Sequence, residues 1–146
     1  MLKSDILLEL HVPSFKMAKD FYGSIGFEVV WEKEADSKKK GYMVMRKGES
    51  ILNFYCGDET VYEHSFFRSF DKNTQRGYGV EIILPIDGIE NFYKEISKLH
   101  ENKIVKELND KYEKKDFRMV DPFGFYLRFV ERYDWVNDRD KFGNKI

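Results

Sequence analysis

Hydrophobic and polar positions alternate at the start of the chain and then change to helical spacing. Within residues 6–12, one face of a predicted strand carries Leu8, Leu10 and Val12, and the opposite face carries Leu7, Glu9 and His11. Pro13 cannot continue a central strand, and Ser14 has a side chain suited to the N-cap of a helix. The apolar residues that come next recur at helical spacing. The opening pattern therefore predicts a strand followed by an amphipathic helix.

The same pattern begins again at residue 80, and the second copy keeps a glutamate, a proline and a Phe-Tyr pair in register with the first. These residues are Glu9, Pro13, Phe21 and Tyr22 in the first copy and Glu81, Pro85, Phe92 and Tyr93 in the second. Chance similarity between two strand–helix units would not be expected to hold all of them in register, so we interpret the pattern as a duplication. Asp87 and Glu90 also have the spacing of a capping box at the start of the second helix.

Three strand-like runs follow each predicted helix. They cover residues 27–33, 41–46 and 50–56 in the first copy and residues 103–108, 116–120 and 125–131 in the second. Each copy is therefore a βαβββ unit, and the predicted fold class is α+β with mixed sheets. We expect each helix to cover one face of its own sheet, while the opposite faces curl toward each other and form a cup.

The predicted domain organisation is a single domain over residues 1–146. Its two repeats lie at about 5–56 and 78–131, joined by a long connection over residues 57–77 and followed by a C-terminal tail over residues 132–146. The connection shows no clean period, carries several aromatic residues and has room for a short helical turn. Loops of this length inside compact domains are often functional.

Composition excludes several classes of protein. Of the 146 residues, 42% are hydrophobic and 35% are charged, and the net charge of −1 provides no basic field for nucleic acid. No apolar run approaches the roughly 20 residues of a membrane span, and the charged segment MLKSDILLEL at the start of the sequence does not resemble a signal peptide. The single cysteine, Cys56, permits no internal disulfide and favours a reducing compartment. We therefore expect a cytoplasmic protein whose partners include neither nucleic acid nor a membrane.

Two segments carry a resemblance to a known family, HVPSFKMAKDFYGSIGFEVVWE at residues 11–32 and MVDPFGFYLRFVE at residues 119–131. With the duplicated βαβββ pattern, they resemble the glyoxalase/bleomycin-resistance/dioxygenase superfamily, whose fold is the vicinal oxygen chelate fold. The resemblance covers about residues 5–131. Within the superfamily, the runs GYMVMRKGESILNFY and GIENFYKEI look most like bleomycin resistance proteins. The resemblance implies a small-molecule ligand and a homodimer.

Metal-dependent members of this superfamily hold a divalent ion with side chains from the first and last strands of each half. The resemblance places those positions at Leu7, Asn53, Gly79 and Arg128. Leucine and glycine donate no ligand atom, and arginine is permanently cationic, so this set does not suit a divalent metal. We therefore expect no metal, no cofactor and no catalytic residue.

A second metal set remains open at Glu9, His11 and Glu81, which alternate onto the cup side. Arg128 is expected to lie among them and to pair with a glutamate instead, because a partly buried carboxylate needs a cationic partner. On this interpretation His11 is a polar residue that lines the cup.

Aromatic residues make up 16% of the chain. Core packing is one explanation for these rings, and a surplus can also line a binding groove. Part of this surplus is expected to line a groove, because flat ligands stack on aromatic rings and cationic ligands are attracted to them. The predicted ligand-binding residues are Glu9, His11, Trp31, Tyr42, Asn53, Tyr55, Phe66, Phe67, Glu81, Tyr126 and Arg128.

Three functions remain open at this point. The favoured function is a non-catalytic protein of the bleomycin-resistance type that sequesters a flat, neutral or cationic drug or metabolite. The alternative is a metal-dependent lyase, transferase or dioxygenase of the glyoxalase superfamily, against which the residues at the metal positions count. A scaffold or regulatory domain without a ligand is the third.

Overall fold

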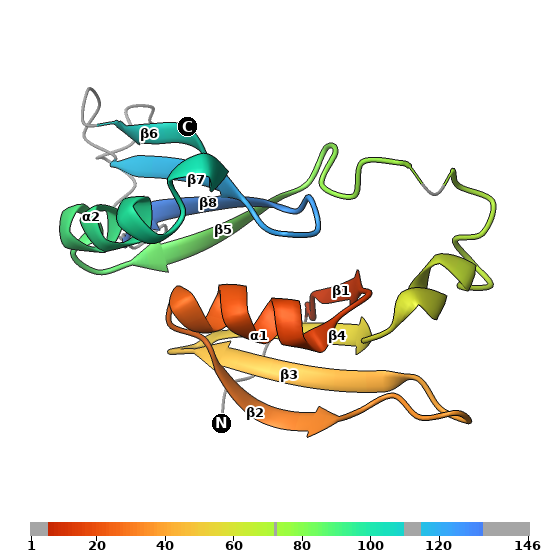
Figure 1. The fold of residues 1–146 in the computed structure, drawn as a ribbon. Coiled ribbons are helices and arrows are strands. Elements are labelled where there is room, and N and C mark those ends of the chain that lie inside the picture. Colours follow the sequence, from red (N-terminus) through yellow and green to blue (C-terminus); the bar gives the residue numbers. More distant parts are fainter. Residues whose placement is uncertain (1–5, 72, 110–114, 133–146) are drawn as a thin grey trace. The chain divides into compact units, whose positions relative to one another are not determined.

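The computed structural model describes residues 6–71, 73–109 and 115–132. Most of the predicted C-terminal tail, residues 133–146, lies outside the described residues. The chain divides into two compact units, Met1–Gln75 and Arg76–Ile146, and each unit contains one of the two predicted repeats (Figure 1). Whether the units form a single domain stays a prediction. No helix among the described residues is long and apolar enough to cross a membrane.

The N-terminal unit is a four-stranded sheet with one helix packed on it (Figure 1). Its elements are β1 (Glu9–Val12), α1 (Phe15–Ser24), β2 (Glu28–Lys33), β3 (Gly41–Lys47), β4 (Ser50–Cys56) and a 3-10 turn, η1 (Glu59–Glu63). The strand order is β1-β4-β3-β2, in which β1 and β4 run parallel and the other pairs are antiparallel. The turn η1 is the short helical turn predicted within the connection.

The C-terminal unit repeats this plan. Its elements are β5 (Glu81–Ile86), α2 (Ile89–Leu99), a 3-10 turn η2 (Glu101–Lys103), β6 (Ile104–Asn109), β7 (Asp116–Val120) and β8 (Tyr126–Glu131). The strand order is β5-β8-β7-β6, with β5 and β8 parallel and the remaining pairs antiparallel. The predicted α+β fold of duplicated βαβββ units is therefore confirmed.

Burial follows the alternation of the sequence, and each sheet packs its apolar face against its own helix. The buried apolar residues of the N-terminal unit include Leu10, Val12, Phe21, Tyr22, Met43 and Phe54, and those of the C-terminal unit include Ile82, Leu84, Phe117, Met119, Leu127 and Phe129. Most of their apolar area is removed from water, which is the main stabilising term of each unit.

The two helices begin differently. The Ser14 side chain accepts a hydrogen bond from the Met17 backbone N–H, as predicted for an N-cap. The capping box predicted for the second helix does not form, because Gly88 occupies the N-cap in a left-handed conformation. Asp87 instead accepts hydrogen bonds from Arg132, and Glu90 accepts one from Lys115.

Candidate functional site

Each sheet has one face turned away from its helix, and we call these the N-terminal and C-terminal open faces. Leu10, Phe54 and Met43 are register partners that point toward α1, so the neighbouring positions in β1, β4 and β3 point the other way. The N-terminal open face consequently carries three of the predicted polar residues and three of the predicted aromatic residues. They are Glu9, His11, Trp31, Tyr42, Asn53 and Tyr55.

Glu9 is the centre of the hydrogen bonding on the N-terminal open face. One carboxylate oxygen lies 3.0 Å from Nε2 of His11, and the other accepts a hydrogen bond of 2.7 Å from the Tyr42 hydroxyl. The two partners come from different strands, so Glu9 links β1 to β3 across β4. Burial raises the pKa of Tyr42 to about 12, and the hydrogen bond to Glu9 adds to the rise because an ionised phenol would face a carboxylate.

Aromatic rings surround this hydrogen-bonded group. The rings of His11 and Tyr55 have centroids 4.8 Å apart, and those of Trp31 and Tyr42 have centroids 6.3 Å apart. Asn53, the register partner of Glu9 on β4, is buried. The face therefore combines the Glu9 carboxylate with several aromatic rings.

The connection after η1 adds rings to this face. His64 lies 5.0 Å from His11 by ring centroids and stacks on Phe67 at 4.7 Å, while Phe66 lies 5.6 Å from His64. The sequence analysis predicted Phe66 and Phe67 but missed His64. Because the connection shows no periodicity, no pattern in the sequence indicated that His64 would contact His11.

The remaining predicted site residues lie on the C-terminal open face. Glu81, Tyr126 and Arg128 all point away from α2, but Arg128 does not pair with a glutamate as predicted. Its Nε donates to Asp116 at 2.7 Å, whereas Glu81 accepts a hydrogen bond from Arg118. Glu81 on β5 and Asp116 on β7 both lie in strands adjacent to that of Arg128, but Asp116 is the more buried carboxylate and has the greater need of a cationic partner.

The strand registers locate the four positions at which the resemblance implied metal ligands. Leu7 and Gly79 lie two residues before β1 and β5, respectively. Arg128 stands opposite Ile83 on β5. The equivalent position of the N-terminal unit stands opposite His11 on β1, and the residue there is Tyr55 instead of Asn53. Among the described residues, no group of three or more His, Cys, Asp or Glu side chains has a geometry that would hold a metal ion.

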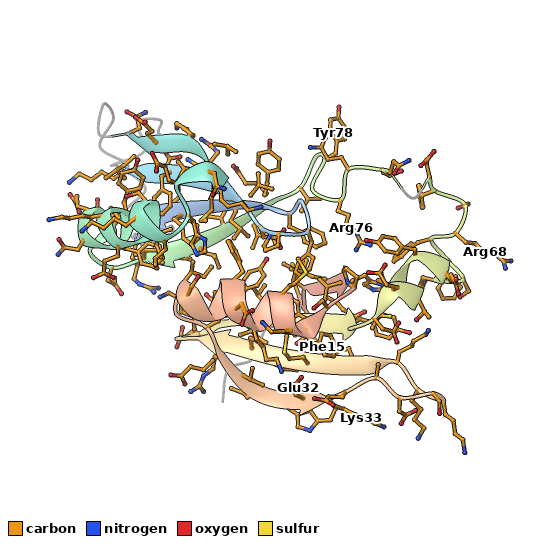
Figure 2. All side chains as sticks on the ribbon, in the orientation of Figure 1. Phe15, Glu32, Lys33, Arg68, Arg76 and Tyr78 are labelled. Atoms are coloured by element: carbon orange, nitrogen blue, oxygen red, sulfur yellow. The ribbon has the colours of Figure 1, made fainter. Side chains whose placement is uncertain are left out.

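A separate hollow of about 520 Å³ lies in the N-terminal unit, beside the start of α1. Its lining comes from α1, the segment after β2 and the turn after β4, and includes Phe15 and Glu32, both labelled in Figure 2. None of the predicted ligand-binding residues contributes to this lining. Lys19 also lines the hollow and donates to Glu32 at 2.9 Å.

Comparison with known proteins identifies the fold. No protein-family model and no curated protein matches the chain. Solved structures do match. A hypothetical protein, SA1046 from S. aureus, has a TM-score of 0.65 at 17% identity and covers 90% of this chain and 95% of its own. A putative glyoxalase family protein from Bacillus anthracis has a TM-score of 0.61 at 20% identity, over 91% of this chain and 98% of its own.

A bleomycin-binding protein solved in complex with bleomycin has a TM-score of 0.58 at 17% identity, over 90% of this chain and 100% of its own. At these identities the likeness establishes the fold. The chain has the fold of the glyoxalase/bleomycin resistance/dioxygenase proteins, as the resemblance of its sequence implied.

Proposed function

We propose that the protein binds a flat, neutral or cationic small molecule and sequesters it without transforming it. The main support for this proposal is the set of aromatic rings around Glu9 on the N-terminal open face. A fold shared with a protein that binds bleomycin supports it. Bleomycin serves as one probe of this proposal.

The Glu9 carboxylate and the rings beside it favour a cation close to Glu9, whereas Lys33 lies at the far end of the same row, on β2. Glu9 contributes a carboxylate that is hydrogen-bonded to the phenol of Tyr42 and to the imidazole of His11. A ligand ring stacked on Tyr55 or Trp31 would gain about 0.5–1.5 kcal/mol beyond its buried area. A cation held over such a ring gains about 0.5–2 kcal/mol.

Other predicted residues have supporting roles in this proposal. Asn53 offers an amide beside Glu9, while Phe66 and Phe67 are exposed rings in the connection that would cover a bound ligand and exclude water. Tyr126 and Arg128, with Glu81, are proposed as ligand contacts of the C-terminal open face, separate from the contacts around Glu9.

Tryptophan fluorescence tests the proposal. The chain has two tryptophans, so the variant Trp135→Phe leaves Trp31 as the reporter beside Tyr42. Ethidium, a flat cation, and bleomycin should each quench this fluorescence saturably. The variant Tyr55→Ala should weaken binding about fivefold, which corresponds to about 1 kcal/mol.

Glu9→Gln should weaken the binding of ethidium but leave that of a neutral flat dye unchanged. Glu49→Gln is the matched control, because Glu49 is exposed in the turn between β3 and β4. If ethidium binds Glu9→Gln as tightly as it binds the Glu49→Gln control, the acidic aromatic face is not the binding site.

Two further measurements test the alternative function, a metal-dependent enzyme. Mass spectrometry should recover each probe unchanged, and elemental analysis after dialysis should find less than one equivalent of divalent metal per chain. A chemically altered probe, or about one equivalent of metal that is lost in Glu9→Ala, would favour a metal-dependent lyase, transferase or dioxygenase instead.

We also propose that the protein is a homodimer. The outer strands β1, β2, β5 and β6 end their sheets, and exposed strand edges favour pairing with another chain. Val30 and Trp31 on β2 are also exposed apolar side chains. Sedimentation at micromolar concentration should give a mass of about twice 17.5 kDa, and a clean monomer would contradict the proposal. A cytoplasmic location remains a prediction.

A further inference from the structure

The C-terminal open face carries a row of three cationic side chains across three neighbouring strands. Lys106 on β6 is the register partner of Arg118 on β7, and Arg118 is the register partner of Arg128 on β8. Neighbouring strands are only about 4.8 Å apart. Like charges directly opposite each other destabilise a sheet, so this row requires counter-charges.

Two carboxylates supply part of that counter-charge. Asp116 is 4% exposed and accepts from Lys106 at 3.0 Å on one oxygen and from Arg128 at 2.7 Å on the other. Arg118 lies 3.5 Å from Asp116 and donates through its Nε to Glu81. Asp116 therefore holds all three cations in position on the open face.

The cluster nevertheless keeps one surplus positive charge, because three cations face two carboxylates. The N–H donors of two guanidinium groups and one ammonium group also outnumber the lone pairs of two carboxylates. The side chains of Arg118, Arg128 and Lys106 remain 27%, 29% and 39% exposed, so solvent and solutes reach them. Partial burial makes a charge-assisted hydrogen bond at such a site stronger than one on an open surface.

Apolar side chains border the cationic row on the same face. Ile83 is the register partner of Arg128 and is exposed, while Tyr126 and Val120 form the next register pair along β8 and β7. A ligand that placed an oxyanion on the guanidinium groups would therefore rest its remaining atoms on apolar and aromatic surface.

We propose that the C-terminal open face binds a monocarboxylate attached to an apolar or aromatic body. The carboxylate accepts hydrogen bonds from Arg118 and Arg128, and Asp116 acts as a positioning residue that orients both guanidinium groups. A planar carboxylate matches the fork of a guanidinium group, and its single charge balances the surplus of the cluster. Glu81 is consequently a partner of Arg118 instead of a source of negative potential for a cationic ligand.

This inference goes beyond the proposed function, which rests on the N-terminal open face. The two proposals fail independently, since the residues and the charge of the probe differ. Loss of ethidium binding says nothing of the carboxylate site, and loss of carboxylate binding leaves the aromatic face untouched.

NMR of the arginine Nε–Hε groups in the full chain provides the test, with sodium benzoate as the probe at constant ionic strength. Benzoate should shift the signals of Arg118 and Arg128 along a saturable curve. The signal of Arg132 should stay in place, because the partner of Arg132 among the described residues is Asp87, and this neutral pair is 56% exposed on the arginine side. Inorganic phosphate and acetate, titrated in parallel, distinguish a carboxylate with an apolar body from a general oxyanion.

Variants separate charge from geometry. Arg128→Gln should weaken benzoate binding roughly tenfold or more. Arg128→Lys keeps the charge but loses the two-pronged guanidinium group, so it should recover only part of that loss. Lys106→Gln neutralises the cluster without replacing either arginine, and it should also weaken benzoate binding. It therefore tests the proposal even if an arginine variant fails to fold. Arg132→Gln should bind benzoate like the wild type.

Three outcomes would overturn the proposal. If benzoate shifted the NMR signal of Arg132 as far as the signals of Arg118 and Arg128, the shifts would reflect general screening of charge by the salt. Unchanged binding in Lys106→Gln and Arg128→Gln would place the site elsewhere. Phosphate or acetate binding more tightly than benzoate would reject the apolar body of the ligand.

Discussion

The two open faces share a backbone plan but differ in chemistry. In each unit, a row of side chains crosses the sheet two residues after the matched glutamate. The row consists of His11, Tyr55, Tyr42 and Lys33 in the N-terminal unit and of Ile83, Arg128, Arg118 and Lys106 in the C-terminal unit. The first row is largely aromatic and the second largely cationic. The βαβββ plan therefore constrains the helix-facing positions, which form the core, and leaves the open faces free to differ.

The helix-facing side also differs between the units, although its residues match in sequence. Phe21 and Tyr22 on α1 are fully buried, whereas Phe92 and Tyr93 on α2 are half-buried. Tyr22 packs edge-on against Phe27 and Phe54 at centroid distances of 5.8 and 5.1 Å. The matched Phe-Tyr pair therefore does not contribute equally to the two cores.

The largest expected effect comes from truncating the matched tyrosines. Tyr22→Ala should lower the free energy of unfolding by about 3–5 kcal/mol, because it empties a fully buried position. Tyr93→Ala should cost roughly half as much, since Tyr93 already contacts solvent and its ring packs on Phe117. Urea unfolding followed by circular dichroism measures both. Equal losses would mean that the two helices pack equally tightly and would remove this difference between the units.

The next largest effect concerns the carboxylate that organises the cationic row. Asp116→Asn should destabilise the protein by about 2 kcal/mol, because Lys106, Arg118 and Arg128 would then repel one another with only Glu81 opposing them. The value is below that of a fully buried pair, since all three cations reach solvent. Thermal unfolding at constant ionic strength measures it.

Asp87→Asn is the matched control for that variant. Asp87 also pairs with an arginine, Arg132, but both side chains are largely exposed, so the expected loss is below about 0.5 kcal/mol. A loss for Asp116→Asn no larger than that for Asp87→Asn would show that the cationic row does not depend on its buried carboxylate.

The same carboxylate predicts a dependence of stability on pH. Burial by itself would raise the pKa of Asp116, but hydrogen bonds from Lys106 and Arg128 outweigh burial and hold the pKa below its ordinary value. Because the folded-state pKa is lowered, the stabilisation is present above the unfolded pKa of about 4 and is lost as pH falls through the folded pKa.

Unfolding free energies measured from neutral pH downward should therefore decrease below about pH 4 in the wild type. Asp116→Asn should show a shallower decrease over the same range, since residue 116 no longer titrates. Parallel curves for the two proteins would contradict the lowered pKa of Asp116.

Much of the fold could be predicted from the sequence because alternation and helical spacing are local signals. The predicted strands at residues 41–46 and 50–56 agree with β3 and β4 to within one residue. The first strand was predicted from residue 6 but begins at Glu9, where pairing with β4 starts. Alternation cannot indicate where a neighbouring strand ends.

The candidate site was predictable only in part. Alternation alone put Glu9 and His11 on the open face, and the structure adds that both contact residues of other strands or of the connection. The run DFRMV places Asp116 and Arg118 on one face in the same way, so this signal was present in the sequence. Their pairing with Arg128 depends on the register between β7 and β8, which no local pattern specifies.

The smallest expected effect lies on the N-terminal open face and concerns the Tyr42 hydroxyl. Its pKa of about 12 arises first from burial and then from the hydrogen bond to Glu9. Since this folded-state pKa is raised, the associated stabilisation is complete below pH 10 or so and is lost as pH rises through the folded value.

In Glu9→Gln the pKa of Tyr42 should fall only part of the way to its ordinary value, because burial remains. At neutral pH the stability should change by less than about 0.5 kcal/mol, since Glu9 is partly exposed. Titration of the tyrosine Cζ signals by NMR, with Glu49→Gln as control, checks this shift. An unchanged pKa of Tyr42 in Glu9→Gln would show that the carboxylate does not govern the chemistry of this face, and the contrast with the cationic row would then rest on the aromatic rings alone.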